Sequence, residues 1–117
     1  MKIKINYKYD SLNNYINKCR TNYHVANNIK QKETELSALA FSKIKAITNF
    51  PIKLTFYWHM KSKVADLDGR LAKNIIDGLV RAKKIPDDNV KYIQEIRHVY
   101  VEDKEDYVEV EIEGGMK

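Results

Sequence analysis

The sequence predicts a small domain of the α/β (α+β) class, in which helices pack on a mixed sheet of about four strands. Three observations support this prediction. The chain has 117 residues, the length of one ordinary domain, so we expect residues 1–117 to fold as a single unit. Hydrophobic residues make up 44% of it and only 4 Gly and 2 Pro occur, which is typical of a folded core. The spacing of the apolar residues switches between strand and helix periods in the order β-α-α-β-α-β-β.

The first half of the chain is expected to contain one strand and two helices. Residues 2–8 alternate apolar side chains with lysines, the pattern of a half-buried strand. Ser11 stands at the expected N-cap of a short helix over residues 12–19, and the Asn-rich residues 20–28 are predicted to be a loop. A second helix is predicted over residues 28–48 and is ended by Asn49 and Pro51. Its apolar stripe consists of Ile29, Leu36, Leu39, Ala40, Ile44 and Ile47.

The second half begins with the clearest strand pattern. Residues 52–60 alternate strictly, so the face that includes Trp58 is predicted to lie in the core and the face that includes His59 to be polar. Residues 71–83 have helical spacing, and residues 85–89 form a predicted loop. Residues 90–101 alternate imperfectly, which predicts a strand with a bulge. A turn at residues 102–105 then leads to the last strand, over residues 108–112.

The composition excludes several classes of protein. A single cysteine, Cys19, excludes an intramolecular disulfide framework and a multi-cysteine zinc site. The sequence has no apolar run near 18 residues and no apolar segment of a secretory signal at its start, so we expect a cytoplasmic protein. The three histidines, His24, His59 and His98, have no ligand spacing to one another.

The charge is divided unevenly along the chain. Residues 1–65 contain 12 Lys and Arg against 3 Asp and Glu, whereas residues 66–117 contain 9 against 13, and the total is +5. Such an asymmetry is a pointer to a nucleic-acid partner. A solvated Lys-rich helix followed by an acidic tail would give the same totals, so the charge alone leaves both interpretations open.

Four aspartates and one lysine near the middle of the chain have residue types suited to catalysis. Asp66 and Asp68 are two residues apart, so in an extended segment both carboxylates point to the same side. Asp87 and Asp88 follow the next predicted helix, and Lys73 lies within that helix. Carboxylates without Cys or clustered His favour hard cations such as Mg²⁺ or Mn²⁺. A structural role is the alternative, because Asp is common as a helix cap and in turns after Pro.

Three known motifs do not fit this stretch. An EF-hand loop needs an oxygen ligand where Arg70 stands and a glutamate where Asp77 stands. The string DLDG is similar to the nucleophile motif of haloacid dehalogenase-type phosphatases, but Lys61, Ser62 and Lys63 occupy the place of their apolar strand. A chain of 117 residues is also too short for that domain and for a glycosyltransferase with an Asp-x-Asp motif.

Residues 50–90 contain an ordered series of short motifs. The series is FPIKLTFYWHM with a basic segment after it, then ADLDG, then K-x-x-x-D-x-L at residues 73–79, then PDDNV. In this order and at this chain length, the sequence resembles the RusA-type Holliday junction resolvases, small endonucleases common in phages and prophages. The upstream segment SLNNYINKCRTNYHVANNIK is similar to the Asn- and Arg-rich segment of phage members.

The resemblance implies a Mg²⁺-dependent endodeoxyribonuclease, with Mn²⁺ as the other candidate cation. Its implied activity is resolution of Holliday junctions or other branched DNA by paired phosphodiester hydrolysis, in recombination and repair. It implies that Asp66, Asp68 and Asp88 are catalytic residues that bind the metal. Lys73 matches the lysine that the family requires, and Asp87 would support the metal from outside its coordination shell. Paired incision also implies a homodimer.

Two departures from the family pattern and two alternative functions accompany this hypothesis. Gly69 replaces the usual Asn, and the spacing from Asp68 to Lys73 is one residue longer. The expected DNA-binding residues are Arg20, Lys30 or Lys32, Lys61, Lys63 and Arg70. The alternatives are a non-catalytic DNA-binding module and a metal nuclease that prefers flaps or forks.

Overall fold

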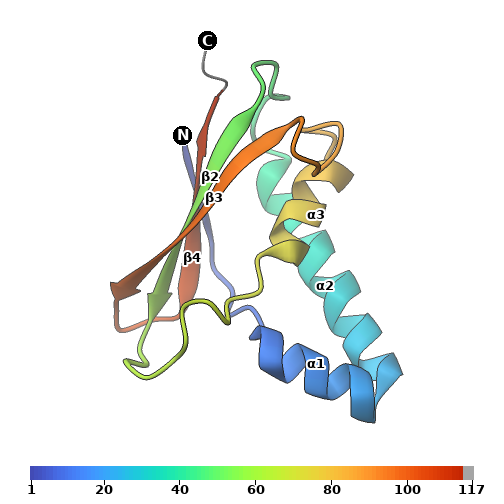
Figure 1. Cartoon of the computed structure of the whole chain (residues 1–117), viewed down its shortest axis with the longest axis vertical. Helices are drawn as coiled ribbons and strands as arrows, with labels where there is room; N and C mark the ends of the chain where they lie inside the picture. The colour runs from blue at the N-terminus through green and yellow to red at the C-terminus, as the bar shows by residue number, and fades with distance from the viewer. Residues whose placement is uncertain (115–117) are drawn as a thin grey trace.

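The computed structural model describes residues 1–114, apart from the side chain of Leu12 (Figure 1). Its elements follow the predicted order and are β1 (Lys2–Ile5), α1 (Leu12–Thr21), α2 (Tyr23–Phe41), β2 (Ile52–Met60), α3 (Lys73–Arg81), β3 (Ile93–Glu102) and β4 (Tyr107–Glu113). The predicted α+β class with a mixed sheet is therefore confirmed. None of the helices in this part of the chain is long and apolar enough to cross a membrane.

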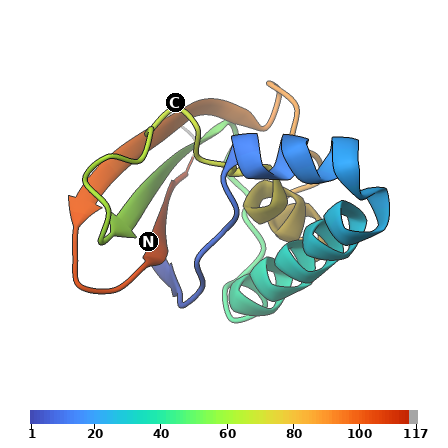
Figure 2. The same ribbon diagram turned by 90° about the horizontal axis from the view of Figure 1, so that it is seen from below.

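The last strand lies inside the sheet. The strand order is β1-β4-β2-β3, with β4 antiparallel to both of its neighbours and β2 parallel to β3. The helices cover one face of this sheet, as Figure 2 shows from below. The fold thus has two layers, with the hydrophobic core between them.

Alternate side chains of β2 form the centre of the core. Leu54 and Phe56 are fully buried, and the predicted burial of Trp58 is confirmed. The indole N–H of Trp58 donates to Nδ1 of His98 at 2.9 Å, and burial lowers the pKa of His98, which keeps that nitrogen free to accept. The other fully buried apolar side chains of the core are Phe41, Ile52, Ile75, Leu79, Val108 and Val110.

The predicted bulge is present at the start of β3. Ile52 is opposite Ile93, but the next residue, Lys53, is opposite Glu95, so Gln94 is the extra residue. The predicted N-cap of α1 is also confirmed, because the Ser11 hydroxyl accepts from the backbone N–H of Asn14 at 3.2 Å.

The predicted loop at residues 20–28 is wrong, because α2 begins at Tyr23. The Asn22 side chain accepts from the backbone N–H of Val25 at 3.2 Å, so an Asn-rich stretch supplies a helix cap here. The helix predicted to reach residue 48 ends at Phe41. Ile44 and Ile47 still pack on the core, but they belong to an irregular segment. The apolar spacing in the sequence does not distinguish such a segment from a continuing helix. Likewise, α3 begins at Lys73 rather than at residue 71, and β3 at residue 93 rather than 90.

Close packing holds α3 against α2. A Cβ atom added to Gly78 would lie 2.4 Å from the Cβ of Ser37 and 2.8 Å from the backbone nitrogen of Ala38. Only glycine therefore allows the two helices to approach this closely.

The parallel pairing of β2 and β3 separates the two acidic stretches. The residues after β2 lie at one end of the strand pair, whereas the residues before β3 lie at the opposite end, beside the start of β2. Figure 1 shows the β2–α3 loop at the lower end of the sheet and the α3–β3 loop at the upper end. Asp66 and Asp68 belong to the first loop, and Asp87 and Asp88 to the second.

Candidate functional site

A cavity of about 680 Å³ lies at the end of the sheet where β2 finishes. Its walls come from the β1–α1 connection, α1, α2, the β2–α3 loop and the β3–β4 turn. We call it the main cavity. Because it is formed by segments from across the chain, only the folded chain creates it.

A buried glutamate lies at the floor of the main cavity. Glu33, from α2, is 0% exposed and accepts from the backbone N–H of Asp10 at 3.0 Å and from Nδ2 of Asn74 at 2.7 Å. Burial raises the pKa of Glu33, and these hydrogen bonds oppose the rise. The same wall contains Tyr9, whose pKa burial also raises and whose hydroxyl is 2.6 Å from the Ser37 hydroxyl.

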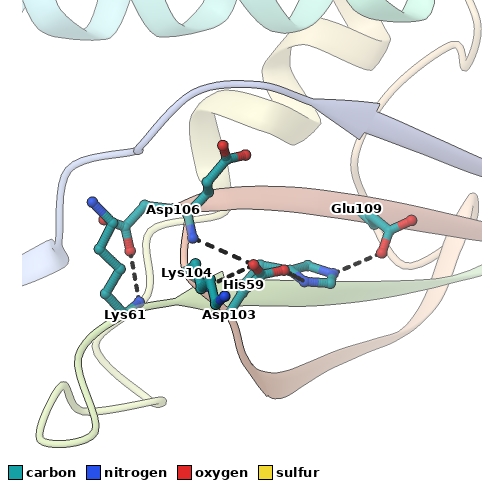
Figure 3. Close-up of polar contacts among 7 residues, drawn as sticks. His59, Lys61, Asp103, Lys104, Asp106 and Glu109 are labelled. Atoms are coloured by element: carbon teal, nitrogen blue, oxygen red, sulfur yellow. Dashed lines mark hydrogen bonds and ion pairs between the residues drawn. The ribbon is translucent and has the colours of Figure 1, made fainter.

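A histidine between two carboxylates closes one side of the main cavity (Figure 3). Nδ1 of His59 is 3.0 Å from Asp103 and Nε2 is 2.6 Å from Glu109. The ring of His59 therefore bridges the two acidic side chains through both of its nitrogens. Its hydrogen bond is the main cause that lowers the pKa of Asp103. The ring of Tyr107 stacks on His59 with centroids 4.1 Å apart, and the group ties β2 to β4 and to the turn between β3 and β4.

Four cationic side chains line the main cavity, and two of them have no acidic partner. Lys18 is 3.1 Å from Asp10, and Lys8 is 3.9 Å from Asp106. By contrast, Lys61 and Arg70 form no ion pair with any residue in the part of the chain that the structure describes.

Hydrogen bonding fixes the direction of the Arg70 side chain. Nε of Arg70 donates to the backbone oxygen of Asp66 at 3.3 Å, and Nη1 is 3.7 Å from the sulfur of Met60. The main cavity therefore offers two uncompensated positive charges to an anion.

The predicted metal ligands Asp66 and Asp68 are exposed on the β2–α3 loop. The turn that carries them is closed by backbone hydrogen bonds, among them Gly69 N–H to the Asp66 oxygen at 3.3 Å. Within residues 1–114, neither carboxylate accepts a hydrogen bond or forms an ion pair. Both are therefore free to bind a cation, and the wall of the main cavity includes Ala65, just before them, and Arg70, just after them.

Asp87 and Asp88 line a different hollow, of about 440 Å³, which we call the second hollow. Asp87 accepts from the backbone N–H of Asp88 at 2.7 Å and from the Asn89 amide at 3.1 Å. These bonds stabilise the turn after Pro86, as expected if Asp87 has a structural role. Asp77 shares this hollow and is 3.6 Å from Lys73, which is the first residue of α3.

The structure does not bring the predicted metal ligands together. In the described part of one chain, no three acidic, His or Cys side chains form a group that could hold a metal ion. Asp66 and Asp68 share a loop, but Asp88 lies at the other end of α3. Asp87 lies beside Asp88, and Lys73 is turned toward Asp77.

The predicted DNA-binding residues divide between several surfaces. Lys61 and Arg70 line the main cavity, whereas Lys30 lines the second hollow. Arg20 is exposed near the end of α1, and Lys63 pairs with Glu102 at 3.0 Å. Lys32, the alternative to Lys30, lies over the ring of Tyr7 at 5.4 Å.

Several residues of the main cavity were not predicted as site residues from the sequence. They include Lys8, Asp10, Lys18, Glu33, Asp106 and Tyr107, and only His59 was noted for its place on a polar strand face. No motif connects them, because they come from the β1–α1 connection, α1, α2 and the region where the β3–β4 turn meets β4. The one available signal was Glu33, a charged residue on the same side of a helix as Ser37 and Phe41.

Comparison with known proteins does not assign this chain to a family. It matches no protein-family model and no curated protein.

Proposed function

We propose that this protein is a metal-dependent endodeoxyribonuclease that cuts four-way or otherwise branched DNA, as its resemblance to RusA-type resolvases implies. The observation that supports the proposal best is the β2–α3 loop. It presents two carboxylates, Asp66 and Asp68, that are unengaged within residues 1–114, and it continues into Arg70, whose guanidinium has no acidic partner among the same residues. A nuclease needs this combination of a cation-binding group beside a phosphate-binding group.

The oxygen chemistry of this pair fits Mg²⁺. Proteins often hold Mg²⁺ through one or two carboxylates, with water and substrate phosphates in the other positions. Asp66 and Asp68 would hold the cation, which when bound lowers the pKa of a water molecule and neutralises phosphate charge. Asp88 does not fit the same site within one chain, because α3 separates it from this loop.

The remaining residues of the loop would bind and orient the DNA. Arg70 can contact a phosphate through two N–H groups while its Nε bond to the Asp66 backbone keeps the guanidinium beside the carboxylates. Lys61 adds a second charge at the mouth of the main cavity. Lys73, 63% exposed at the start of α3, would stabilise negative charge that develops on the phosphate.

The proposed activity also leads to proposals for the oligomeric state and the cellular location of the protein. Symmetric incision of a four-way junction needs two sites related by a two-fold axis, so we propose a homodimer. Because the family that the chain resembles is common in phages and prophages, we propose that the protein acts in the cytoplasm.

One assay tests the function. End-labelled four-way junction, fork and linear duplex are incubated with and without Mg²⁺, using the wild type, Asp68→Asn and the control Glu105→Gln. Glu105 is an exposed carboxylate on the β3–β4 turn and does not line the main cavity, so its substitution makes the same change of charge outside the proposed site. We expect paired nicks in the junction from the wild type and the control, and loss of cleavage with retained binding in Asp68→Asn. Full cleavage by Asp68→Asn would refute the assignment.

A non-catalytic DNA-binding module is the second candidate. It is favoured by the lack of a three-carboxylate group in the described residues. Tight binding of the junction without any Mg²⁺-dependent nicking would support this candidate over the nuclease. Nicking of flaps or forks in preference to junctions would instead identify a nuclease of different specificity.

A further inference from the structure

The main cavity is too large to serve only as a phosphate site. Its volume of about 680 Å³ lies within the range of about 300–1,000 Å³ that is typical for sites of drug-sized organic ligands. A single nucleotide is a ligand of that size. The cavity also lies directly beside the loop that carries Asp66 and Asp68.

The lining of the main cavity has the chemical groups that a nucleotide needs. Uncompensated charges on Lys61 and Arg70 suit a phosphate. The aromatic ring of Tyr7 and the apolar side chains of Ile29 and Met60 suit the flat faces of a base. Behind these groups, the Glu33 carboxylate is 0% exposed and accepts from the backbone of Asp10 and from Asn74, so it holds the wall in place and does not contact the base itself.

We propose that the main cavity receives one unpaired nucleotide of the branched DNA. This inference rests on the proposed function, because it names the part of the substrate that the cavity takes. The phosphate of that nucleotide would contact Lys61 and Arg70, and the adjoining phosphodiester would reach the loop of Asp66 and Asp68.

The cavity then explains how the protein selects branched DNA. A base inside a duplex must be unpaired and unstacked before it can enter a pocket, and this costs a few kcal/mol in an intact duplex. The cost is smallest for a nucleotide that is already unpaired at a branch point. The cavity therefore favours branched DNA that exposes an unpaired or unstacked nucleotide over an intact duplex.

Substitution of residues in two walls tests the inference. Asn14 is exposed on α1 and lines the main cavity, so Asn14→Trp introduces a bulky ring into it. Asn13 is exposed on the same helix and does not line it, which makes Asn13→Trp the matched control. Ser62→Trp introduces the same ring from the β2–α3 loop, in case the first variant does not fold. Circular dichroism melting establishes that each variant is folded.

Binding is measured by fluorescence anisotropy without Mg²⁺, so that no cleavage occurs. The DNA is a duplex with one unpaired nucleotide, and a second DNA has an abasic site in that position. We expect the abasic DNA to bind about tenfold more weakly to the wild type, as for the loss of one base contact with an aromatic ring. Asn14→Trp and Ser62→Trp should bind both DNAs with the weaker affinity, and Asn13→Trp should behave as the wild type.

Equal binding of the two DNAs by the wild type would overturn the inference, and so would unchanged discrimination in both cavity variants. Binding of free dTMP or dAMP, measured by calorimetry, without discrimination between the DNAs would also overturn it, because the ligand would then be a free nucleotide. Nicking with Mg²⁺ is measured on the same DNA. Discrimination without nicking supports the cavity and refutes the nuclease, whereas nicking without discrimination does the reverse.

Discussion

The two ends of the β2–β3 strand pair contain aspartates of two different kinds. At the end with the main cavity, Asp66 and Asp68 are exposed and have no partner within the described residues. At the end with the second hollow, Asp87 is held by its own turn and Asp77 by Lys73. Asp66 and Asp68 are thus available for a ligand, whereas Asp77 and Asp87 are occupied with local structure. The Asp88 carboxylate, by contrast with its neighbour Asp87, has no partner within residues 1–114.

The cations show this contrast only in part, because Lys30 lines the second hollow without an ion pair in residues 1–114 and Lys18 in the main cavity is paired. Arg81 lines the second hollow and is 3.7 Å from Glu35 and 3.4 Å from the Gln31 side chain, so it already has partners. Lys61 and Arg70 in the main cavity have no acidic partner in residues 1–114. This comparison indicates that an acid-rich stretch is a candidate site only where the fold leaves its charges uncompensated.

The largest expected effect contrasts one aspartate from each end. Asp68→Asn should lower the rate of junction cleavage by about 10²–10³-fold, the size of effect typical when one charge-stabilising group of a catalytic site is removed. Asp88→Asn should have a smaller effect, because α3 separates Asp88 from the loop. Single-turnover cleavage of labelled junction measures both rates. If both substitutions lowered the cleavage rate equally, the contrast between the two ends would be wrong. Both ends would then act in one site, which requires two copies of the chain.

The second prediction tests the packing of α3, the helix that separates the two ends. Gly78→Ala should lower the free energy of unfolding by about 1–3 kcal/mol, because the new Cβ would collide with Ser37 and the backbone of α2. Gly69→Ala is the control, since its Cβ would meet the nearest atoms at an ordinary 3.5 Å. Urea unfolding measures both, and an equal effect of the two substitutions would contradict this account of the packing.

The third prediction concerns pH and the floor of the main cavity. The raised pKa of Glu33 means that the folded state binds this proton more tightly than the unfolded chain does. Its contribution to stability is therefore complete below the unfolded pKa and is lost as pH rises through the folded pKa. Each tenfold difference in proton affinity between the folded and unfolded states contributes about 1.4 kcal/mol to the free energy of unfolding.

Urea unfolding across the pH range from acid to neutral tests this assignment. In Glu33→Gln, the free energy of unfolding should no longer decrease through this cause as the pH rises. Glu35 is 71% exposed on the same helix, so Glu35→Gln should retain the decrease. An unchanged pH profile in Glu33→Gln would contradict the assignment.

The smallest expected effect is on the salt dependence of DNA binding. Lys61→Gln should lower the slope of log affinity against log salt concentration by about one, the loss of one phosphate contact. Lys83→Gln changes an exposed charge at the other end of the strand pair and should leave the slope unchanged. Titrations of labelled junction at several salt concentrations measure the slopes. A larger change for Lys83→Gln would place the DNA at the other end of the strand pair instead.

The fold brings basic residues of the first half of the chain next to acidic residues of the second half. Lys2 and Lys4 of the basic half lie opposite Glu111 and Glu109 of the acidic half, because β1 pairs with β4. The two lysines also lie over the rings of Tyr57 and Tyr107, at 4.5 and 4.2 Å. The outer face of the sheet is therefore mixed in charge, which sequence totals do not show.

Local patterns were sufficient for much of this protein. The strict alternation of residues 52–60 identified β2 and its buried face, and the Ser11 cap identified the start of α1. The loop prediction for residues 20–28 was wrong, because Asn can cap a helix as well as form a loop. A pattern that is compatible with one local structure gave a correct prediction. A pattern that is compatible with either a loop or a helix cap did not.

The sequence by itself determined the α+β class, the order of the elements, the core strand and the loop that carries Asp66 and Asp68. Only the tertiary structure decided which of these residues meet. Because β2 and β3 are parallel, the residues after one and before the other lie at opposite ends, so Asp88 is far from the site while Glu33 and His59 border it. Hydrophobic spacing determines which face of a strand is buried, but strand direction depends on contacts between segments distant in the chain.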